Sequence, residues 1–128
     1  MKIEHIAVAF NSEENADRFF IDLLGMKKIR NFDVEAALMK AFFGIAQKHA
    51  FIRYESQNLA VEVIITDSKE NAKDRFTHSC WLVENVEKLI EKANSLGFIT
   101  IKVPRKNREG FYYFVRDSFN NLYEIKQL

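Results

Sequence analysis

The chain has 128 residues, and 48% of them are hydrophobic, which is enough apolar side chain for a sizeable core within one domain. Its 19 basic and 18 acidic residues leave a formal net charge of +1, which excludes long-range electrostatic attraction to nucleic acid or anionic membranes. The one cysteine, Cys80, has no internal disulfide partner, and no stretch approaches the ~20 apolar residues that span a bilayer, so we expect a cytoplasmic protein without a membrane segment.

The chain opens with an apolar run around His5 that predicts a strand, and the residues that follow have the pattern of an amphipathic helix. Asn11 followed by Glu14 predicts a capping box at the start of this helix, and Gly25 predicts its end. The apolar face of the helix consists of Ala16, Phe19, Phe20, Leu23 and Leu24. We therefore expect this helix to pack onto a sheet.

Further strands are expected in the first half of the chain, because segments rich in Val, Ile, Phe and Tyr occupy roughly residues 26–33, 48–54 and 59–66. The segment from Asn31 to Ile45 is ambiguous, since VEAALMKAFFGI is compatible with a short helix, a strand or a mobile loop. The first half therefore has the pattern strand, helix, strand, strand, strand, with one undecided segment.

The same order of elements recurs from His78 onward. Asn85 predicts the start of a second helix, and Gly97 predicts its end. The apolar stripe of this helix consists of Val86, Leu89, Ile90, Ala93 and Leu96. The strands that follow are predicted at roughly 99–103, 111–116 and 122–127.

The sequence is therefore an internal repeat of two βαβββ modules, at about residues 1–68 and 74–128. HIAVAFNSEENADRFFIDLLGM in the first module aligns with HSCWLVENVEKLIEKANSLGF in the second, and the offset from His to Gly is 20 and 19 residues. His5 and Glu62 are 57 positions apart and His78 and Glu124 are 46 apart, so the first module carries about eleven extra residues. The pattern predicts an α+β fold in which both helices pack onto sheets.

Each module has one His on its opening strand and one Glu on its closing strand. Because side chains alternate along a strand, His5, Glu62, His78 and Glu124 each lie among apolar neighbours. A single His or Glu on a strand is more often a partly exposed or hydrogen-bonded residue, but recurrence in both modules favours a ligand set. A buried carboxylate needs a partner or a cation. Two imidazoles and two carboxylates suit a divalent metal, and zinc, nickel, cobalt, iron and manganese are all compatible.

The chain resembles the vicinal oxygen chelate superfamily, and within it the bacterial type of glyoxalase I. The matching segments are IEHIAVAF, FFIDLLGMK, AVEVI, THSCWLVENVEKL, SLGF and FYYFVRDSFNNLYEI. The resemblance implies a single domain over residues 1–128, with curved mixed sheets and helices packed on the outside. It also implies a homodimer with shared sites, each holding one divalent metal ion, with zinc or nickel favoured. The implied ligands are His5, Glu62, His78 and Glu124.

The resemblance further implies an enzyme that isomerises the hemithioacetal of methylglyoxal and a thiol through an enediolate, in methylglyoxal detoxification. Glu124 is then the catalytic base, and Glu62 is a ligand and second candidate base. Two alternatives stay open. One is another metalloenzyme of the superfamily, such as an epimerase or a thiol transferase, and the other is a metal-free resistance protein that binds a small molecule.

The turn before the last strand, residues 117–121, reads DSFNN where the family commonly has Asp-Pro-Asp-Gly, and Asn can adopt the left-handed conformation that such a turn needs. Six cations could bind an acidic group of the substrate at the pocket mouth: Arg30, Arg53, Lys102, Arg105, Lys106 and Arg108. Most of them are expected to be solvated, and the charged loop 104–110 is the favoured candidate. Cys80 is predicted to share a face with His78, although a buried thiol usually packs as a small hydrophobic group.

Overall fold

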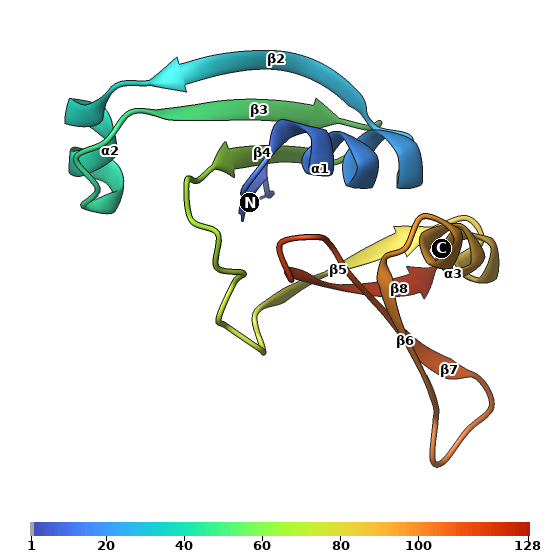
Figure 1. Cartoon of the computed structure of the whole chain (residues 1–128). Coiled ribbons are helices and arrows are strands. Elements are labelled where there is room, and N and C mark those ends of the chain that lie inside the picture. Colours follow the sequence, from blue (N-terminus) through green and yellow to red (C-terminus); the bar gives the residue numbers. More distant parts are fainter. Residues whose placement is uncertain (1) are drawn as a thin grey trace. The chain divides into compact units, whose positions relative to one another are not determined.

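The computed structural model describes residues 2–128, which form two compact units, one ending at Lys69 and the other running from Glu70 to Leu128. Each unit contains one four-stranded sheet (Figure 1). The predicted α+β fold with two βαβββ modules is thereby confirmed. In the part of the chain described, no helix has the length and apolar character needed to cross a bilayer.

The first unit contains β1 (Ile6–Phe10), α1 (Glu13–Asp17), η1 (Arg18–Leu23), β2 (Lys27–Val34), α2 (Ala36–Phe43), β3 (His49–Glu55) and β4 (Ala60–Ile65). The strand order in its sheet is β1-β4-β3-β2. β1 runs parallel to β4, and the other neighbours are antiparallel. β2, β3 and β4 each begin and end within one residue of the predicted bounds.

The second unit contains β5 (His78–Val83), α3 (Val86–Ser95), β6 (Ile99–Pro104), β7 (Phe111–Arg116) and β8 (Leu122–Gln127). The strand order is β5-β8-β7-β6, with β5 parallel to β8 and the other neighbours antiparallel. The bounds predicted for β7 and β8 are confirmed, and β6 extends one residue further than predicted. This sheet has the same topology as the sheet of the first unit.

The first helix begins one residue later than the predicted capping box requires. Ser12 is the cap: its backbone is extended, with φ of −153°, and its hydroxyl accepts a hydrogen bond from the backbone N–H of Asn15 at 3.0 Å. The prediction of Asn11 as the cap is therefore wrong. α1 continues directly into the π-helical η1, and Gly25 ends it in the left-handed region at φ 69°, as predicted. In the second unit Asn85 caps α3 as predicted, since its side chain accepts from the N–H of Lys88.

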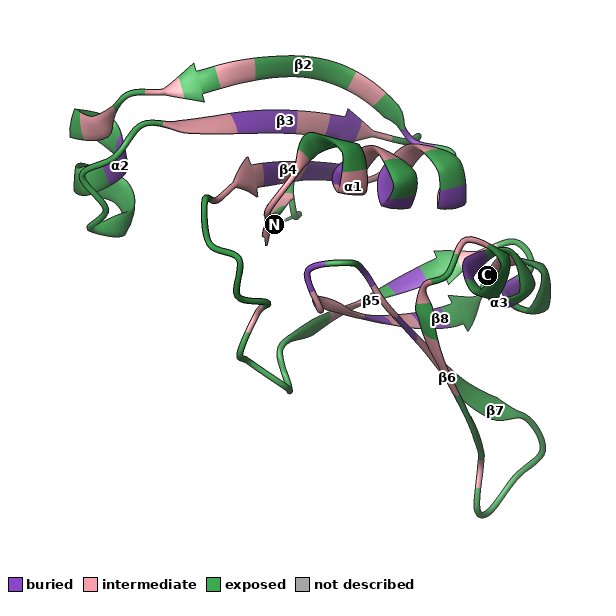
Figure 2. Cartoon of the chain, viewed as in Figure 1, coloured by how far each residue is buried: buried purple, intermediate pink, exposed green. Residues whose placement is uncertain are grey.

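One face of each sheet is covered by its own helix. In the first unit Tyr54 pairs with Val61 in the strand register, and both are fully buried. Phe20 of η1 stacks on Tyr54 with ring centroids 5.0 Å apart. Figure 2 shows the buried stretches along β3 and β4 and on the helix. In the second unit Tyr123 and Trp81 contribute equivalent buried rings, 4.9 Å apart.

The segment left undecided by the sequence, residues 31–45, divides between two elements: its first residues complete β2, and Ala36–Phe43 form α2. The helix follows β2 and ends at Gly44, which adopts a left-handed conformation with φ 74°. Met39 is buried, and Phe43 packs against Phe51 of β3 with ring centroids 6.5 Å apart. α2 lies between the second and third strands of the first module, where the second module has no helix. It therefore accounts for the extra length of the first module.

The turn between β7 and β8 is closed around the buried carboxylate of Asp117, which is 5% exposed. Its Oδ1 accepts from the backbone N–H groups of Phe119 at 2.9 Å and Asn121 at 3.0 Å, and its Oδ2 accepts from the Tyr123 hydroxyl at 2.7 Å. Of the two Asn residues in this turn, Asn120 adopts the left-handed conformation that the sequence leaves open to Asn, with φ 70°. Burial raises the pKa of Asp117, and these hydrogen bonds oppose that shift. The carboxylate of Asp117 thus stabilises a turn that contains neither Pro nor Gly.

Replacing Asp117 with Ala should lower the free energy of unfolding by about 3 kcal/mol, because buried donors that lose their acceptor each cost roughly 1–3 kcal/mol. Urea denaturation followed by circular dichroism measures this change. The control is Asp33→Ala, at a side chain that is 50% exposed and pairs with Lys48. It should shift stability by less than about 0.5 kcal/mol. Equal effects of the two substitutions would contradict the structural role of Asp117.

Candidate metal centre

Each unit brings one predicted histidine close to one predicted glutamate. In the first unit His5 Nε2 lies 3.5 Å from Glu62 Oε2, and in the second His78 Nε2 lies 3.8 Å from Glu124 Oε2. The exposed fractions also match, at 37% and 38% for the histidines and 14% and 15% for the glutamates. We call His5 with Glu62 the first half-site and His78 with Glu124 the second half-site.

Strand pairing explains how each half-site forms. His5 immediately precedes β1, which runs beside β4, and His78 is the first residue of β5, which runs beside β8. Alternation along β4 and β8 turns Glu62 and Glu124 to the face that the helix does not cover, since their chain neighbours Val61 and Tyr123 face the helix. His78 thus lies on its strand as predicted, whereas His5 lies one residue before its strand.

The second ring nitrogen of each histidine faces an acceptor. His78 Nδ1 lies 2.7 Å from the backbone carbonyl oxygen of Phe76, and His5 Nδ1 is hydrogen-bonded to the Glu4 carboxylate. Because a carbonyl or ionised carboxylate oxygen can only accept, each Nδ1 carries a hydrogen. In the neutral imidazole, Nε2 then directs its lone pair toward the glutamate. Metal-bound histidines commonly have this arrangement, in which the other N–H donates to a carboxylate or a backbone carbonyl.

The donors of both half-sites fit a divalent transition metal. Two ligands on one tetrahedral ion, with bonds of about 2.0–2.2 Å, lie roughly 3.4 Å apart. The His to Glu separations of 3.5 and 3.8 Å are close to this value and longer than an ordinary hydrogen bond. Within residues 2–128, no group of three or more His, Cys, Asp or Glu side chains could hold a metal ion. Each half-site therefore supplies only part of a coordination shell.

A cation from the same sheet pairs with each glutamate. Arg53 Nη1 lies 3.5 Å from Glu62 Oε1, and Lys126 Nζ lies 3.3 Å from Glu124 Oε1. Arg53 also binds Glu4, and the hydrogen bonds from Arg53 and His5 lower the pKa of Glu4 to about 2. Glu4 is thus ionised near neutral pH and can accept the hydrogen of His5 Nδ1.

Two further residues border the second half-site. Cys80 is the register partner of Glu124, and partial desolvation together with the Glu124 charge raises the pKa of its thiol. Cys80 is exposed, so its thiol does not pack as a buried hydrophobic group. The Phe114 ring packs edge-on against the His78 imidazole, with centroids 5.7 Å apart, and limits the orientations of that ring.

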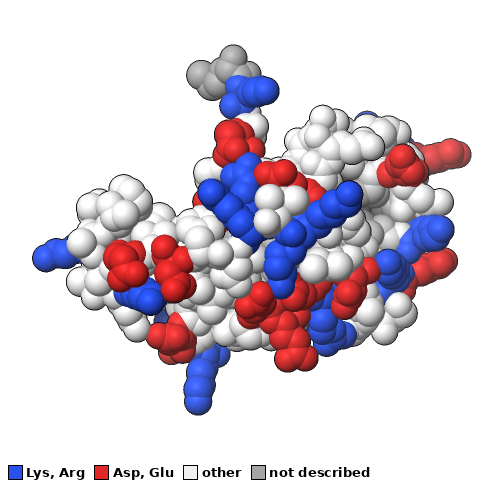
Figure 3. Space-filling model, turned by 90° about the horizontal axis from the view of Figure 1, so that it is seen from above, with Lys and Arg blue, Asp and Glu red and all other residues white. Residues whose placement is uncertain are grey.

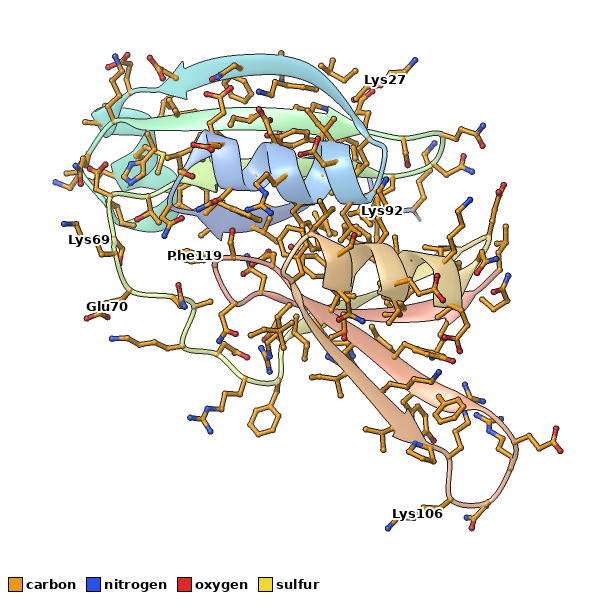
Figure 4. The ribbon with its side chains drawn as sticks, turned by 45° about the vertical axis from the view of Figure 1, so that its right-hand side comes forward. Lys27, Lys69, Glu70, Lys92, Lys106 and Phe119 are labelled. Carbon is orange, nitrogen blue, oxygen red and sulfur yellow. The ribbon has the colours of Figure 1, made fainter. Side chains whose placement is uncertain are left out.

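The charged loop 104–110 forms the tip of the β6–β7 hairpin, where Lys106 is labelled in Figure 4. Arg105 lines a cavity of about 590 Å³ together with Tyr113. Tyr113 belongs to the helix-covered side of the sheet, because its register partner is the buried Ile125. The role predicted for this loop in binding a substrate acid stays a prediction.

Sequence reasoning named Arg53 only as a candidate cation for the substrate, and it missed Glu4 as a neighbour of the first half-site. Most of the candidate cations were expected to be solvated, whereas the side chain of Arg53 is only 15% exposed. The register of β3 against β4 places it opposite Glu62, and this register is not visible in the sequence. The one available signal was an Arg in the middle of an otherwise apolar strand.

Charges of both signs are interspersed on the face shown in Figure 3. Opposite charges also pair directly in this protein: Lys28 binds Glu13 at 2.7 Å and Asp17 at 2.8 Å. This face therefore lacks the single-sign patch that characterises a nucleic-acid-binding surface.

Comparison with known proteins gives a family match and a shared fold. Residues 4–114 match the family model of the Glyoxalase/Bleomycin resistance protein/Dioxygenase superfamily. No curated protein matches the chain by sequence.

Solved structures with the same fold cover nearly the whole chain. A glyoxalase family protein from Bacillus cereus has a TM-score of 0.76 at 12% identity, with 98% of this chain and 92% of that chain covered. One from Enterococcus faecalis has a TM-score of 0.71 at 16% identity, with 97% and 95% covered. The fosfomycin resistance protein FosX from Listeria monocytogenes, complexed with Mn(II) and sulfate, has a TM-score of 0.69 at 13% identity, with 99% and 92% covered. At these identities the likeness establishes the fold.

Proposed function

The chain belongs to the glyoxalase/bleomycin resistance protein/dioxygenase superfamily, and from this membership we propose that it is a metal-dependent lyase of the glyoxalase I type. Its substrate is the hemithioacetal of methylglyoxal and a thiol, which it isomerises by moving a proton between adjacent carbons. Its metal is divalent, with zinc or nickel favoured and cobalt, manganese or iron compatible. Its role is the detoxification of methylglyoxal in the cytoplasm.

The observation that carries this proposal is the repetition of one His–Glu pair, with the same ring orientation, in both modules. His5 and His78 each direct Nε2 toward a glutamate while an acceptor holds Nδ1. A protein that only encloses a small organic molecule does not require two such pairs. Two nitrogen and two carboxylate donors suit a catalytic divalent metal that keeps positions open for substrate.

A complete site needs both half-sites, because each contributes two donors and a metal ion binds at least four. We place His5 and Glu62 of one subunit together with His78 and Glu124 of the partner subunit, around a two-fold axis. A homodimer then contains two equivalent shared sites. The internal repeat supports this arrangement, since both half-sites have the same geometry.

When bound, the metal supplies a Lewis acid that stabilises negative charge on the two vicinal oxygens of the substrate. Glu124 takes the proton from carbon. Its side chain is held only loosely, because its partner Lys126 is 46% exposed and exposed ion pairs contribute little stabilisation. Glu62 acts mainly as a ligand, since Arg53 beside it is largely buried and fixed by other carboxylates. The substrate hydroxyl proton requires a second acceptor, for which Glu62 is the candidate.

The test combines metal analysis with an activity screen. Protein purified without chelator should contain about one divalent metal per shared site, and it should convert methylglyoxal with at least one thiol of a panel that includes glutathione. Removing the metal with a chelator should abolish the conversion, and adding it back should restore it. Full metal content without conversion by any thiol would contradict the isomerase proposal and direct the search to epimerase or fosfomycin substrates. Absence of metal would favour a metal-free binding protein.

A further inference from the structure

We propose that Arg53 is a positioning residue of the first half-site, which holds Glu4 and Glu62 on either side of His5 and thereby fixes the tautomer of that histidine. This inference rests on the proposed metal-binding function, because it concerns a residue that prepares His5 and Glu62 for a metal. It adds two residues, Arg53 and Glu4, to the machinery of the site.

The geometry is a closed ring of four side chains. Arg53 Nη2 donates to Glu4 Oε1 at 2.6 Å, and Arg53 Nη1 lies 3.5 Å from Glu62 Oε1. The remaining Oε2 atoms face the histidine: that of Glu4 accepts from His5 Nδ1, and that of Glu62 lies 3.5 Å from His5 Nε2. Glu4 Oε2 also accepts from Arg53 Nη1 at 3.5 Å, so each carboxylate contacts both Arg53 and His5.

Arg53 is suited to this role by its chemistry and its surroundings. A third carboxylate, Glu55, accepts from its Nε at 2.6 Å, so the guanidinium plane is fixed in orientation. Its side chain is 15% exposed, whereas that of Glu4 is 67% exposed. Glu4 thus has little of its own packing and depends on Arg53 for its position. A lysine ammonium is a point charge and cannot bridge two carboxylates with a rigid fork.

The second half-site has a different support. His78 Nδ1 donates to the backbone carbonyl of Phe76, and Asp74 holds this turn by accepting from the N–H groups of Phe76 at 2.8 Å and Thr77 at 2.7 Å. A backbone acceptor does not depend on a distant side chain. His78 is therefore an internal reference, whose tautomer should not respond to changes at Arg53.

The test reads the histidine tautomers directly in metal-free protein. Long-range ¹H–¹⁵N correlation spectra, which distinguish the two neutral tautomers from the imidazolium, should show at alkaline pH the Nδ1–H form for His5 and His78 in the wild type. In Arg53→Met, the tautomer population of His5 should shift toward the Nε2–H form, in which Nε2 has no lone pair to offer a metal. The tautomer of His78 should stay unchanged. Arg53→Lys should give an intermediate result. Lys48→Met, which removes an exposed ion pair with Asp33, is the control and should change neither ring.

A second readout is the affinity for Co²⁺ or Zn²⁺, which should fall about 10- to 100-fold in Arg53→Met, the usual effect of losing a residue that orients a ligand. An unchanged His5 tautomer in both Arg53 variants would overturn the proposal. If Arg53→Met does not fold, Arg53→Lys, which keeps the charge and the stem, decides the question. If the wild type binds no metal but Arg53→Met still shows the tautomer shift, the proposed function is refuted and the role of Arg53 is retained.

Discussion

Replacing Glu124 with Gln is expected to lower kcat for the hemithioacetal roughly 1000-fold, within the range that general-base catalysis contributes. Gln keeps the size of the side chain and a carbonyl oxygen that can still bind the metal, but it cannot take a proton from carbon. Thermal unfolding should change little, because Glu124 lies on the sheet face that its helix does not cover. Initial rates with the thiol found active in the screen measure the effect.

The matched control for this prediction is Glu109→Gln, a substitution of the same chemistry in the β6–β7 hairpin loop, which should leave kcat unchanged. Metal content must be measured in both variants. A normal kcat in Glu124→Gln with full metal would remove Glu124 from the role of base. If Glu124→Gln loses the metal, the contribution of Glu124 as a ligand outweighs its role as a base.

His5→Ala and His78→Ala should each lose metal retention and activity as pure homodimers, yet mixing the two should restore part of both. If the sites are shared, refolding a 1:1 mixture makes about half of the dimers heterodimers, each with one intact site and one doubly damaged site. About a quarter of all sites should then bind metal and turn over substrate. Metal analysis and activity after unfolding and joint refolding provide the measurement.

Mixing His5→Ala with Glu62→Ala is the control, because both substitutions damage the first half-site. Every site in that heterodimer carries one lesion, so no recovery is expected. A monomer in solution with full metal content would refute the shared-site arrangement. The same conclusion would follow if the His5→Ala and His78→Ala mixture stayed inactive although heterodimers had formed.

Local sequence signals were sufficient for most elements of this protein. The strand bounds follow from runs of β-branched and aromatic residues, and the cap of α3 follows from Asn85, because both signals act over a few residues. The internal repeat directed attention to His5, Glu62, His78 and Glu124, and strand alternation assigned the glutamates to one face. The left-handed Asn120 was also predictable, since few other residues tolerate that conformation.

Only the tertiary structure decided which side chains meet across strands. The pairing of Arg53 with Glu62 depends on the register of β3 against β4, and the acceptor of His78 depends on a turn held by Asp74. Within the segment 31–45, residues Ala36–Phe43 form α2 because Met39 is buried and Phe43 packs against Phe51, contacts that the sequence of the segment does not specify. These features arise from contacts between residues far apart in the chain or from competition between similar local conformations, and short-range preferences cannot rank such alternatives.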